Sequence, residues 1–173
     1  AVREGRTVYG NIRKTIHFLM SCNIGEILVV LVSFLLRTPT PLLPAQLLWV
    51  NLVTDSLPAI ALGVDPADAD SMEQPPRREN SLFSDGMVSR IALEGAMIGM
   101  LALLAFGIGH IYFDEERAYI TGRTMAFAVL SLSQLIHAFN MRSEHSLFRI
   151  SPLGNPMLLL AFFIGCLMQI GVI

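Results

Sequence analysis

The chain has 173 residues, of which 53% are hydrophobic and 15% are charged, and its formal net charge is −2. A mean hydropathy of +0.58 excludes an ordinary soluble domain of this length, because such domains contain about 25% charged residues and fewer apolar ones. The sequence has no basic cluster of the kind that neutralises nucleic-acid phosphates, so we expect no nucleic-acid partner.

The apolar residues are gathered into long runs. A membrane-spanning helix needs about 20 mostly apolar residues, and such spans must be helical because lipid offers the backbone no hydrogen-bond partners. The sequence therefore predicts an all-α fold, a polytopic membrane helical bundle of about five transmembrane helices. The fourth run is the shortest and is rich in Ser, Gln and His. The predicted spans are Ile16–Leu36, Leu42–Val64, Met87–Phe113, Thr124–Phe139 and Pro156–Ile173.

Lysine and arginine lie unevenly on the two sides of these spans. Nine of the twelve fall on the side of the N-terminal segment, and the positive-inside rule places that side in the cytoplasm. The polar N-terminal segment runs into the first span without a proline, so we expect one long helix extended as a cytoplasmic stalk. The predicted parts are a stalk at 1–15, an ion-binding helical hairpin at 16–64, a cytoplasmic loop at 65–86 and supporting membrane helices at 87–173.

Two carboxylates lie near the middle of predicted spans, Glu26 in the first and Asp55 in the second. An ionisable side chain at bilayer depth costs about 2.5 kcal/mol or more, and it rarely persists unless it faces an ion path or a partner. The connection between the two spans is short, so we expect antiparallel neighbours whose polar faces meet near the midplane.

Pro58 follows Asp55 closely, and its ring nitrogen cannot donate to the carbonyl of Thr54. We therefore expect the helix to be opened or kinked beside Asp55, which frees a carbonyl at bilayer depth for water, protein or an ion. The alternative is a kink without function, since proline is common in membrane helices.

Amide and hydroxyl side chains accompany both carboxylates. Asn23 lies three residues before Glu26, so these two residues are expected to share a helix face. Asn51 lies four residues before Asp55, and Thr54 lies three residues after Asn51, so this second group is expected to share a face as well.

Gln134, near the middle of the fourth span, offers another oxygen. All these donors are oxygen atoms, which hard cations prefer, and Ca²⁺ takes about six to eight of them. The pattern therefore predicts a cation site. The alternative is that the polar groups only join helices by hydrogen bonds. The candidate metal ligands are Asn23, Glu26, Asn51, Thr54, Asp55 and Gln134.

Soft donors are less favoured as ligands. Cys22 and Cys166 lie inside predicted spans, and we expect small buried hydrophobic residues there, with a disulfide or soft-metal site as the alternative. The histidines lie near span ends or in loops, and we do not expect them to bind a metal. They are His17, His110, His137 and His145.

The third span contains a further carboxylate, Glu94, with Arg90 one helical turn before it. An ion pair within the helix, or snorkelling toward the membrane surface, explains this acid without an ion site. Gly95 and Gly99 are four residues apart in the same span, a spacing that allows close contact with another helix.

Several stretches resemble a known family. Residues 46–59 read QLLWVNLVTDSLPA and resemble the sixth membrane helix of P-type cation-transporting ATPases of the calcium-pump branch. Residues 21–26, SCNIGE, resemble the fifth helix, and residues 4–11, EGRTVYGN, resemble the stalk before it. Residues 65–77, DPADADSMEQPPR, resemble the loop after the sixth helix. The five spans are thereby identified as helices five to nine, in the C-terminal membrane region.

The resemblance implies that side-chain oxygens matching five positions coordinate the transported ions, with Asp55 shared between sites. The animal reticulum calcium pump has Glu at the position matching Gln134, so one charge is lost here. A single-ion stoichiometry, or some use of sodium or protons, stays open. The five implied ligands are Asn23, Glu26, Asn51, Thr54 and Asp55.

The resemblance further implies the cation-binding part of an ATP-driven pump that exports Ca²⁺ from the cytoplasm, and we expect proton counter-transport. ATP and Mg²⁺ are then needed only by the full-length protein. No ATP-handling motif is found, so we expect this segment to be inactive alone. The alternatives are a pump for another cation (Na⁺/K⁺ or H⁺) and a structural or passive bundle with a degenerate site.

Both ends of the chain look cut, and we expect a piece of a longer protein. Its expected partners are the lipid bilayer and the preceding membrane helices and cytoplasmic domains of the same pump. We expect an integral, multi-pass protein of a prokaryotic plasma membrane.

Overall fold

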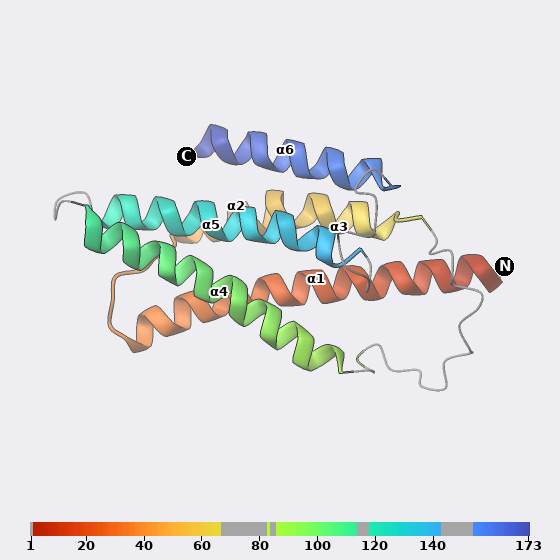
Figure 1. Cartoon of the computed structure of the whole chain (residues 1–173), viewed down its shortest axis with the longest axis horizontal. Helices are drawn as coiled ribbons and strands as arrows, with labels where there is room; N and C mark the ends of the chain where they lie inside the picture. Colours follow the sequence, from red (N-terminus) through yellow and green to blue (C-terminus); the bar gives the residue numbers. More distant parts are fainter. Residues whose placement is uncertain (1, 67–82, 84–85, 114–117, 143–153) are drawn as a thin grey trace.

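The computed structural model describes residues 2–66, 83, 86–113, 118–142 and 154–173, and every regular element within these ranges is helical (Figure 1). The expected all-α fold is confirmed. Most of the predicted loop at 65–86 lies outside the described residues, as does His145. The elements are α1 (Val2–Leu35), α2 (Pro44–Trp49), the π-helical segment η1 (Val50–Asp55), α3 (Ser56–Gly63), α4 (Met87–Tyr112), α5 (Ala118–Asn140) and α6 (Pro156–Val172).

The predicted stalk and first span form one continuous helix, as expected. α1 has 34 residues, and its N-terminal end projects beyond the ends of α3, α5 and α6 (Figure 1). The absence of proline from Val2 to Leu35 lets the backbone ladder continue from the polar segment into the apolar one.

Within the part of the chain that the structure describes, three helices are long and apolar enough to cross a membrane: α1, the joined helix Pro44–Gly63, and α4. α6 is a shorter apolar helix of 17 residues, and it begins where Asn155 accepts a hydrogen bond from the backbone nitrogen of Leu158 at 3.0 Å. α5 begins at Ala118 rather than at the predicted Thr124. Its 23 residues are enough to cross, but its serine, glutamine and histidine side chains lower its apolar character.

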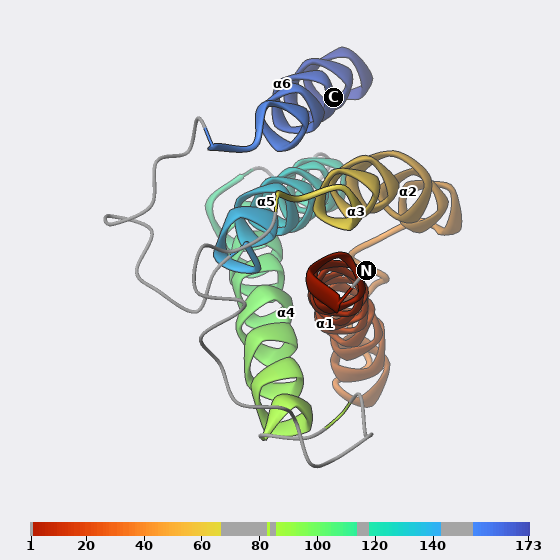
Figure 2. The same ribbon diagram turned by 90° about the vertical axis from the view of Figure 1, so that its right-hand side faces the viewer.

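The end-on view in Figure 2 shows how the helices are layered. α1 and α4 lie side by side, α5 packs on α4, and α3 packs on α1. α6 is outermost and packs on α3 and α5. The hairpin that carries Glu26 and Asp55 therefore faces α5, which carries Gln134.

Glycines bring α1 and α4 into close contact, as their spacing predicted. A Cβ atom on Gly95 would lie 2.7 Å from the carbonyl oxygen of Ser21, and one on Gly99 would lie 2.9 Å from that of Gly25. Only hydrogen fits at these positions. Membrane helices associate largely through such close packing, because lipid supplies no hydrophobic force between them.

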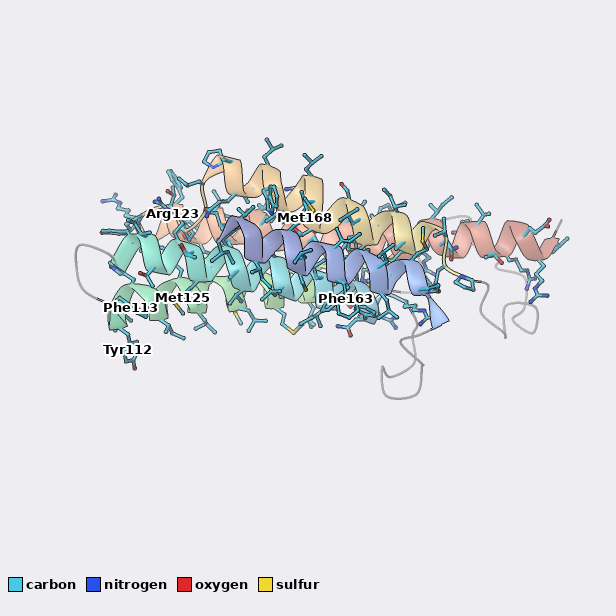
Figure 3. The ribbon with its side chains drawn as sticks, turned by 90° about the horizontal axis from the view of Figure 1, so that it is seen from above. Tyr112, Phe113, Arg123, Met125, Phe163 and Met168 are labelled. Atoms are coloured by element: carbon cyan, nitrogen blue, oxygen red, sulfur yellow. The ribbon has the colours of Figure 1, made fainter. Side chains whose placement is uncertain are left out.

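The outward faces of the bundle carry large apolar side chains, several of which are labelled in Figure 3. Tyr112 at the end of α4 is 79% exposed and Phe163 on α6 is 65% exposed. Soluble monomers rarely expose apolar surface on this scale. These faces suit lipid or further membrane helices.

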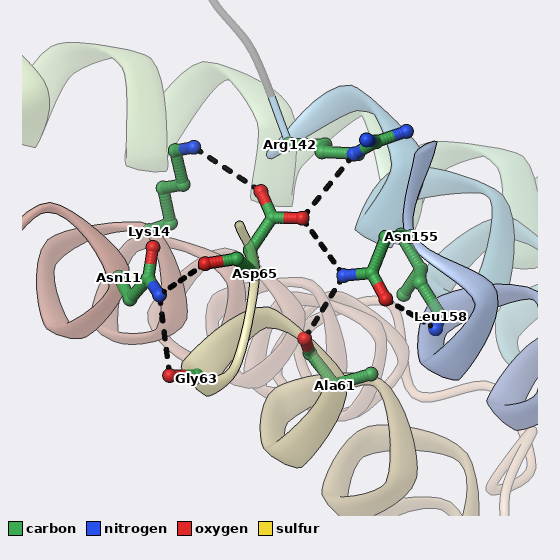
Figure 4. Close-up of polar contacts among 8 residues, drawn as sticks. All are labelled: Asn11, Lys14, Ala61, Gly63, Asp65, Arg142, Asn155 and Leu158. Atoms are coloured by element: carbon green, nitrogen blue, oxygen red, sulfur yellow. Dashed lines mark hydrogen bonds and ion pairs between the residues drawn. The ribbon is translucent and has the colours of Figure 1, made fainter. Parts of the chain in front are cut away.

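A polar network around Asp65, just after the end of α3, joins the stalk part of α1 to residues near the end of α5 and the start of α6 (Figure 4). Its Oδ1 accepts hydrogen bonds from Asn155 Nδ2 at 2.8 Å and Arg142 Nε at 3.3 Å, and its Oδ2 pairs with Lys14 Nζ at 3.3 Å. Its backbone carbonyl accepts from Asn11 Nδ2 at 2.8 Å. The stalk part of α1 is thereby attached to the ends of α3 and α5 and to the start of α6.

Candidate cation site

Glu26 is the centre of a polar layer formed by α1, η1 and α5. Its side chain is 6% exposed. Oε2 accepts a hydrogen bond from Asn51 Nδ2 at 2.6 Å, and Oε1 accepts one from Gln134 Nε2 at 3.0 Å. Residues far apart in the sequence are therefore brought to one carboxylate, as the polar-face argument predicted.

Asp55 completes the layer. It is 1% exposed, and neither of its carboxylate oxygens has a hydrogen-bond partner among the described residues. The Glu26 carboxylate lies close enough to repel it, and the Cys22 thiol, which is only a weak donor, lies beside it. Buried polar atoms in folded proteins nearly always have a partner, so an unpartnered buried carboxylate indicates a place for a cation, a proton or water.

The predicted opening of the helix beside Asp55 takes the form of the π-helical segment η1, which ends at Asp55. Pro58 lies one turn further along, where it cannot donate to the carbonyl four residues back. The Ser56 hydroxyl donates to the carbonyl of Asn51 at 2.9 Å, a bond that spans five residues. Wide turns of this kind occur frequently at functional sites.

Two apolar clusters flank the polar layer. On α1, Glu26 lies between Cys22 of one cluster and Val29 of the other, and the same order holds along η1–α3 and α5. The site is thus shielded along the helix axes in both directions. One cluster contains Val29, Leu42, Val50, Ile98, Ala102, Phe106, Ala126, Phe127 and Leu130, and the other contains Phe18, Cys22, Ala59, Ala61, Leu62, Ala138, Leu158 and Ala161.

Residues 39–173 match the protein family described as "Cation transporting ATPase, C-terminus". The chain belongs to this family. The match includes η1 and α5, which carry three of the polar groups around Glu26 and Asp55. The resemblance identified from the sequence is confirmed, and the chain is part of the membrane region of a P-type cation-transporting ATPase.

The similarity to individual relatives of this ATPase segment includes α1 as well. Calcium-transporting ATPase 1 of Bacillus cereus is 46% identical over 188 residues, covering 100% of this chain and 21% of that protein. The calcium-transporting ATPase of Bacillus subtilis is 45% identical over 174 residues, covering 100% and 19%. A probable calcium-transporting ATPase of Trypanosoma brucei brucei is 36% identical over 186 residues, covering 94% and 18%. The chain spans about a fifth of the length of these relatives.

Two predicted ligands of the ATPase segment, Thr54 and Asn23, make no hydrogen bond to Glu26 and bond instead to backbone carbonyls of their own helices. Thr54 is fully buried, and its hydroxyl donates to the carbonyl of Val50 at 2.8 Å, which leaves its oxygen lone pairs available. Asn23 is exposed, and its Nδ2 donates to the carbonyl of Leu19 at 2.7 Å. The expectation that Asn23 shares the buried face of Glu26 is wrong for this arrangement, because three residues along a helix still leave about 60° between side chains.

Two residues that sequence reasoning did not assign to the site lie at its edge. The Cys22 thiol occupies the buried face of α1 and interacts electrostatically with Asp55 and Glu26. Ser131 is fully buried, and its hydroxyl has no hydrogen-bond partner among the described residues. Its position three residues before Gln134 was a signal that could have found it.

Glu94 does not pair with Arg90, contrary to the sequence-based expectation. Its Oε2 lies 2.7 Å from Nε2 of His17 and 3.7 Å from Nε2 of His137, and the Ser21 hydroxyl donates to it at 3.2 Å. The close contact of α1 with α4 at Gly95 presents these groups across the helix interface, whereas Arg90 is exposed.

Proposed function

We propose that this chain is the cation-binding part of the membrane region of an ATP-driven pump that exports Ca²⁺ from the cytoplasm. The observation that carries the proposal is the pair of buried, unpartnered oxygens of Asp55 beside the Glu26 carboxylate. Two buried carboxylates repel one another unless a positive charge compensates them. The names of the bacterial relatives, calcium-transporting ATPases, support Ca²⁺ as that charge.

One Ca²⁺ per transport cycle suits the charges of the site. Glu26 and Asp55 together carry two negative charges, which one divalent cation balances. Gln134 contributes an oxygen without a third charge, and its Oε1 has no hydrogen-bond partner among the described residues. The Asn51 and Thr54 oxygens bring the shell toward the six to eight oxygens that Ca²⁺ takes.

Asn23 joins this shell in the complete pump. It lies on the exposed side of α1, next to the buried face that carries Glu26. The preceding membrane helices of the same pump cover that side and contribute the remaining oxygens. Binding through Asn23 would exchange its hydrogen bond to the Leu19 carbonyl for the cation.

Proton counter-transport follows from the same charges. When Ca²⁺ leaves, two buried carboxylates stay behind at a cost of several kcal/mol each unless they are compensated. Protons taken up from the side that receives Ca²⁺ supply that compensation and return to the cytoplasm when Ca²⁺ binds again.

The chemistry that drives transport belongs to the cytoplasmic domains of the full-length protein, which use ATP and Mg²⁺. We assign residues 1–15 to a stalk that transmits their movement, 16–64 to the ion-binding hairpin, 65–86 to a cytoplasmic loop and 87–173 to supporting helices. This segment alone does not hydrolyse ATP. Two relatives come from Bacillus species, which supports a prokaryotic plasma membrane as its location.

The decisive variant is Asp55→Asn in the full-length parent pump, because it removes one charge and keeps the shape of the side chain. We expect the Ca²⁺ concentration for half-maximal phosphorylation by ATP to rise at least about tenfold, since a charged ligand contributes on the order of 1.4 kcal/mol or more. Equilibrium binding of ⁴⁵Ca²⁺ should weaken in parallel.

The control is Ser33→Ala. It removes a buried hydroxyl on α1, away from the site, that donates to the carbonyl of Val29 within the same helix. This control should leave the Ca²⁺ dependence unchanged. An Asp55→Asn pump that keeps the parent's Ca²⁺ dependence and thermal stability would contradict the proposal and favour a structural bundle with a degenerate site.

A further inference from the structure

A second cluster of titratable side chains lies outside the cation site, at the contact of three helices. Glu94 on α4 faces His17 on α1 and His137 on α5, and one carboxylate oxygen, Oε2, approaches both Nε2 atoms, at 2.7 and 3.7 Å. The Ser21 hydroxyl donates to the same oxygen at 3.2 Å. The proposed pump mechanism uses none of these groups.

The members of this Glu94 cluster differ in their access to solvent. The side chains of His17 and Glu94 are 14% and 22% exposed, whereas that of His137 is 3% exposed. Neither ring nitrogen of His137 has a hydrogen-bond partner among the described residues, and its ring stacks on Phe18. The His137 imidazole can therefore bind a proton beside the Glu94 carboxylate. Because Glu94 is partly exposed, a proton can reach the cluster from its side.

The cluster lies apart from the cation site along α1. The titratable groups that act on Glu94 are His17 from α1 and His137 from α5, and those that act on His137 are Glu94 and His17. Glu26 lies nine residues after His17 on α1, about 13 Å further along the helix axis. A change of protonation at Glu94 is therefore distinguishable from one at the Ca²⁺ ligands.

The position of the cluster links proton occupancy to helix packing. It adjoins the close contact of Gly95 on α4 with the Ser21 carbonyl and the Ile24 side chain of α1. With an imidazole protonated, the Glu94 carboxylate attracts α1 or α5 to α4. With both imidazoles neutral, the carboxylate lacks a compensating charge, and only hydrogen bonds remain.

We propose that His17, Glu94 and His137 form a proton-binding site, separate from the cation site, whose occupancy sets how firmly α1 is held against α4 and α5. The ligand is the proton itself. Because α1 also carries Glu26, the site makes the packing of the cation-binding helix respond to pH on the side predicted to face the cytoplasm. This proposal does not depend on the identity of the transported ion.

The test is the thermal stability of the full-length parent protein, measured without Ca²⁺ between about pH 6 and pH 8.5, a range that spans the ordinary titration of histidine. Glu94→Gln keeps an oxygen that accepts from His17 and Ser21 but removes the charge. The carboxylate attracts imidazolium and not neutral imidazole, so the stability advantage of the parent over Glu94→Gln should grow as pH falls. We expect the difference in Tm to be larger by about 2 °C or more at pH 6 than at pH 8.5.

A second variant and a control complete the experiment. His137→Phe keeps a ring to stack on Phe18, and in this background the effect of Glu94→Gln at pH 6 should shrink, because the two residues are coupled. His110→Gln changes an exposed histidine near the other end of the same α4 helix, where its ring lies against Phe106 and Tyr119, and its stability should follow the parent at each pH.

A Glu94→Gln effect of the same size at every pH would show a purely structural role and overturn the proposal. If Glu94→Gln does not fold, His137→Phe decides the matter alone. Its pH dependence should differ from that of the parent and of His110→Gln, and parallel curves for all three proteins would overturn the proposal.

Discussion

Nε2 of Gln134 lies 3.0 Å from Oε1 of Glu26, although 108 positions separate the two residues in the sequence. The contact joins α5 to α1 across the centre of the bundle and gives the carboxylate a neutral donor. Asn51 supplies the second donor, so both oxygens of Glu26 are bonded while those of Asp55 are not. The two acids thus have different environments within one polar layer.

Gln134→Glu should make the bundle more dependent on its cation. The new carboxylate would replace the amide that donates to Glu26, so a third acid would face two others and lose a hydrogen bond. We expect a lower Tm in chelator than for the parent, and a larger rise in Tm on adding Ca²⁺. Differential scanning fluorimetry of the full-length protein measures both. An unchanged Tm in chelator would argue against the contact between positions 26 and 134.

Glu26→Gln removes the shared acceptor of two donors. A glutamine has one oxygen, so either the Asn51 or the Gln134 amide loses its bond, which costs about 1–3 kcal/mol at a buried position. Ca²⁺ binding by ⁴⁵Ca²⁺ filtration should also weaken at least about tenfold. Retention of the parent's affinity would remove Glu26 from the ligand set, and Ser33→Ala is again the control.

Gly95→Ala should destabilise the α1–α4 contact. The added methyl group would lie 2.7 Å from the Ser21 carbonyl oxygen, which is backbone and cannot turn away. We expect a loss of about 1–3 kcal/mol in stability, as for other overpacked interiors. Gly107→Ala on the same helix is a matched control, because a Cβ there meets nothing within 4 Å. Equal Tm values for the two variants would contradict the close packing.

Asp65→Ala should loosen the attachment of the stalk. It removes a buried acceptor that receives Lys14, Arg142 and Asn155 (Figure 4). A loss of about 1–3 kcal/mol is expected. Asp65→Asn retains an oxygen for Asn155 and should be less harmful. Limited proteolysis near the end of α3, together with Tm, measures the change, and identical behaviour of both variants and the parent would refute this role of the network.

Much of the fold was predictable because lipid restricts the choices. Long apolar runs must be helical, and the absence of proline through residue 35 predicted that stalk and span are one helix. The first three spans were therefore found with small shifts at their ends. The start of α5 was harder to predict, because Thr121, Gly122 and Arg123 interrupt the apolar run, and the segment packs on α4 through the Gly109–Gly122 contact.

Part of the site was also predictable, because helical spacing decides which side chains share a face. Helical spacing correctly grouped Asn51 with Asp55, and the short hairpin brought them to Glu26. Spacing alone cannot give the rotation of a helix about its axis, which decided between Cys22 and Asn23 on the buried face of α1. The partner of Glu94 was missed because His17 and His137 reach it across helix interfaces, which local spacing does not reveal.

The two apolar clusters on either side of Glu26 separate the polar layer from both ends of the bundle. A bare ion leaving the polar layer along the helix axes would enter hydrocarbon in either direction, at a cost far above thermal energy. If the proposed cation occupies this layer, the two clusters therefore shield it along the helix axes in both directions. A conducting route to either surface requires one cluster to part while the other stays closed.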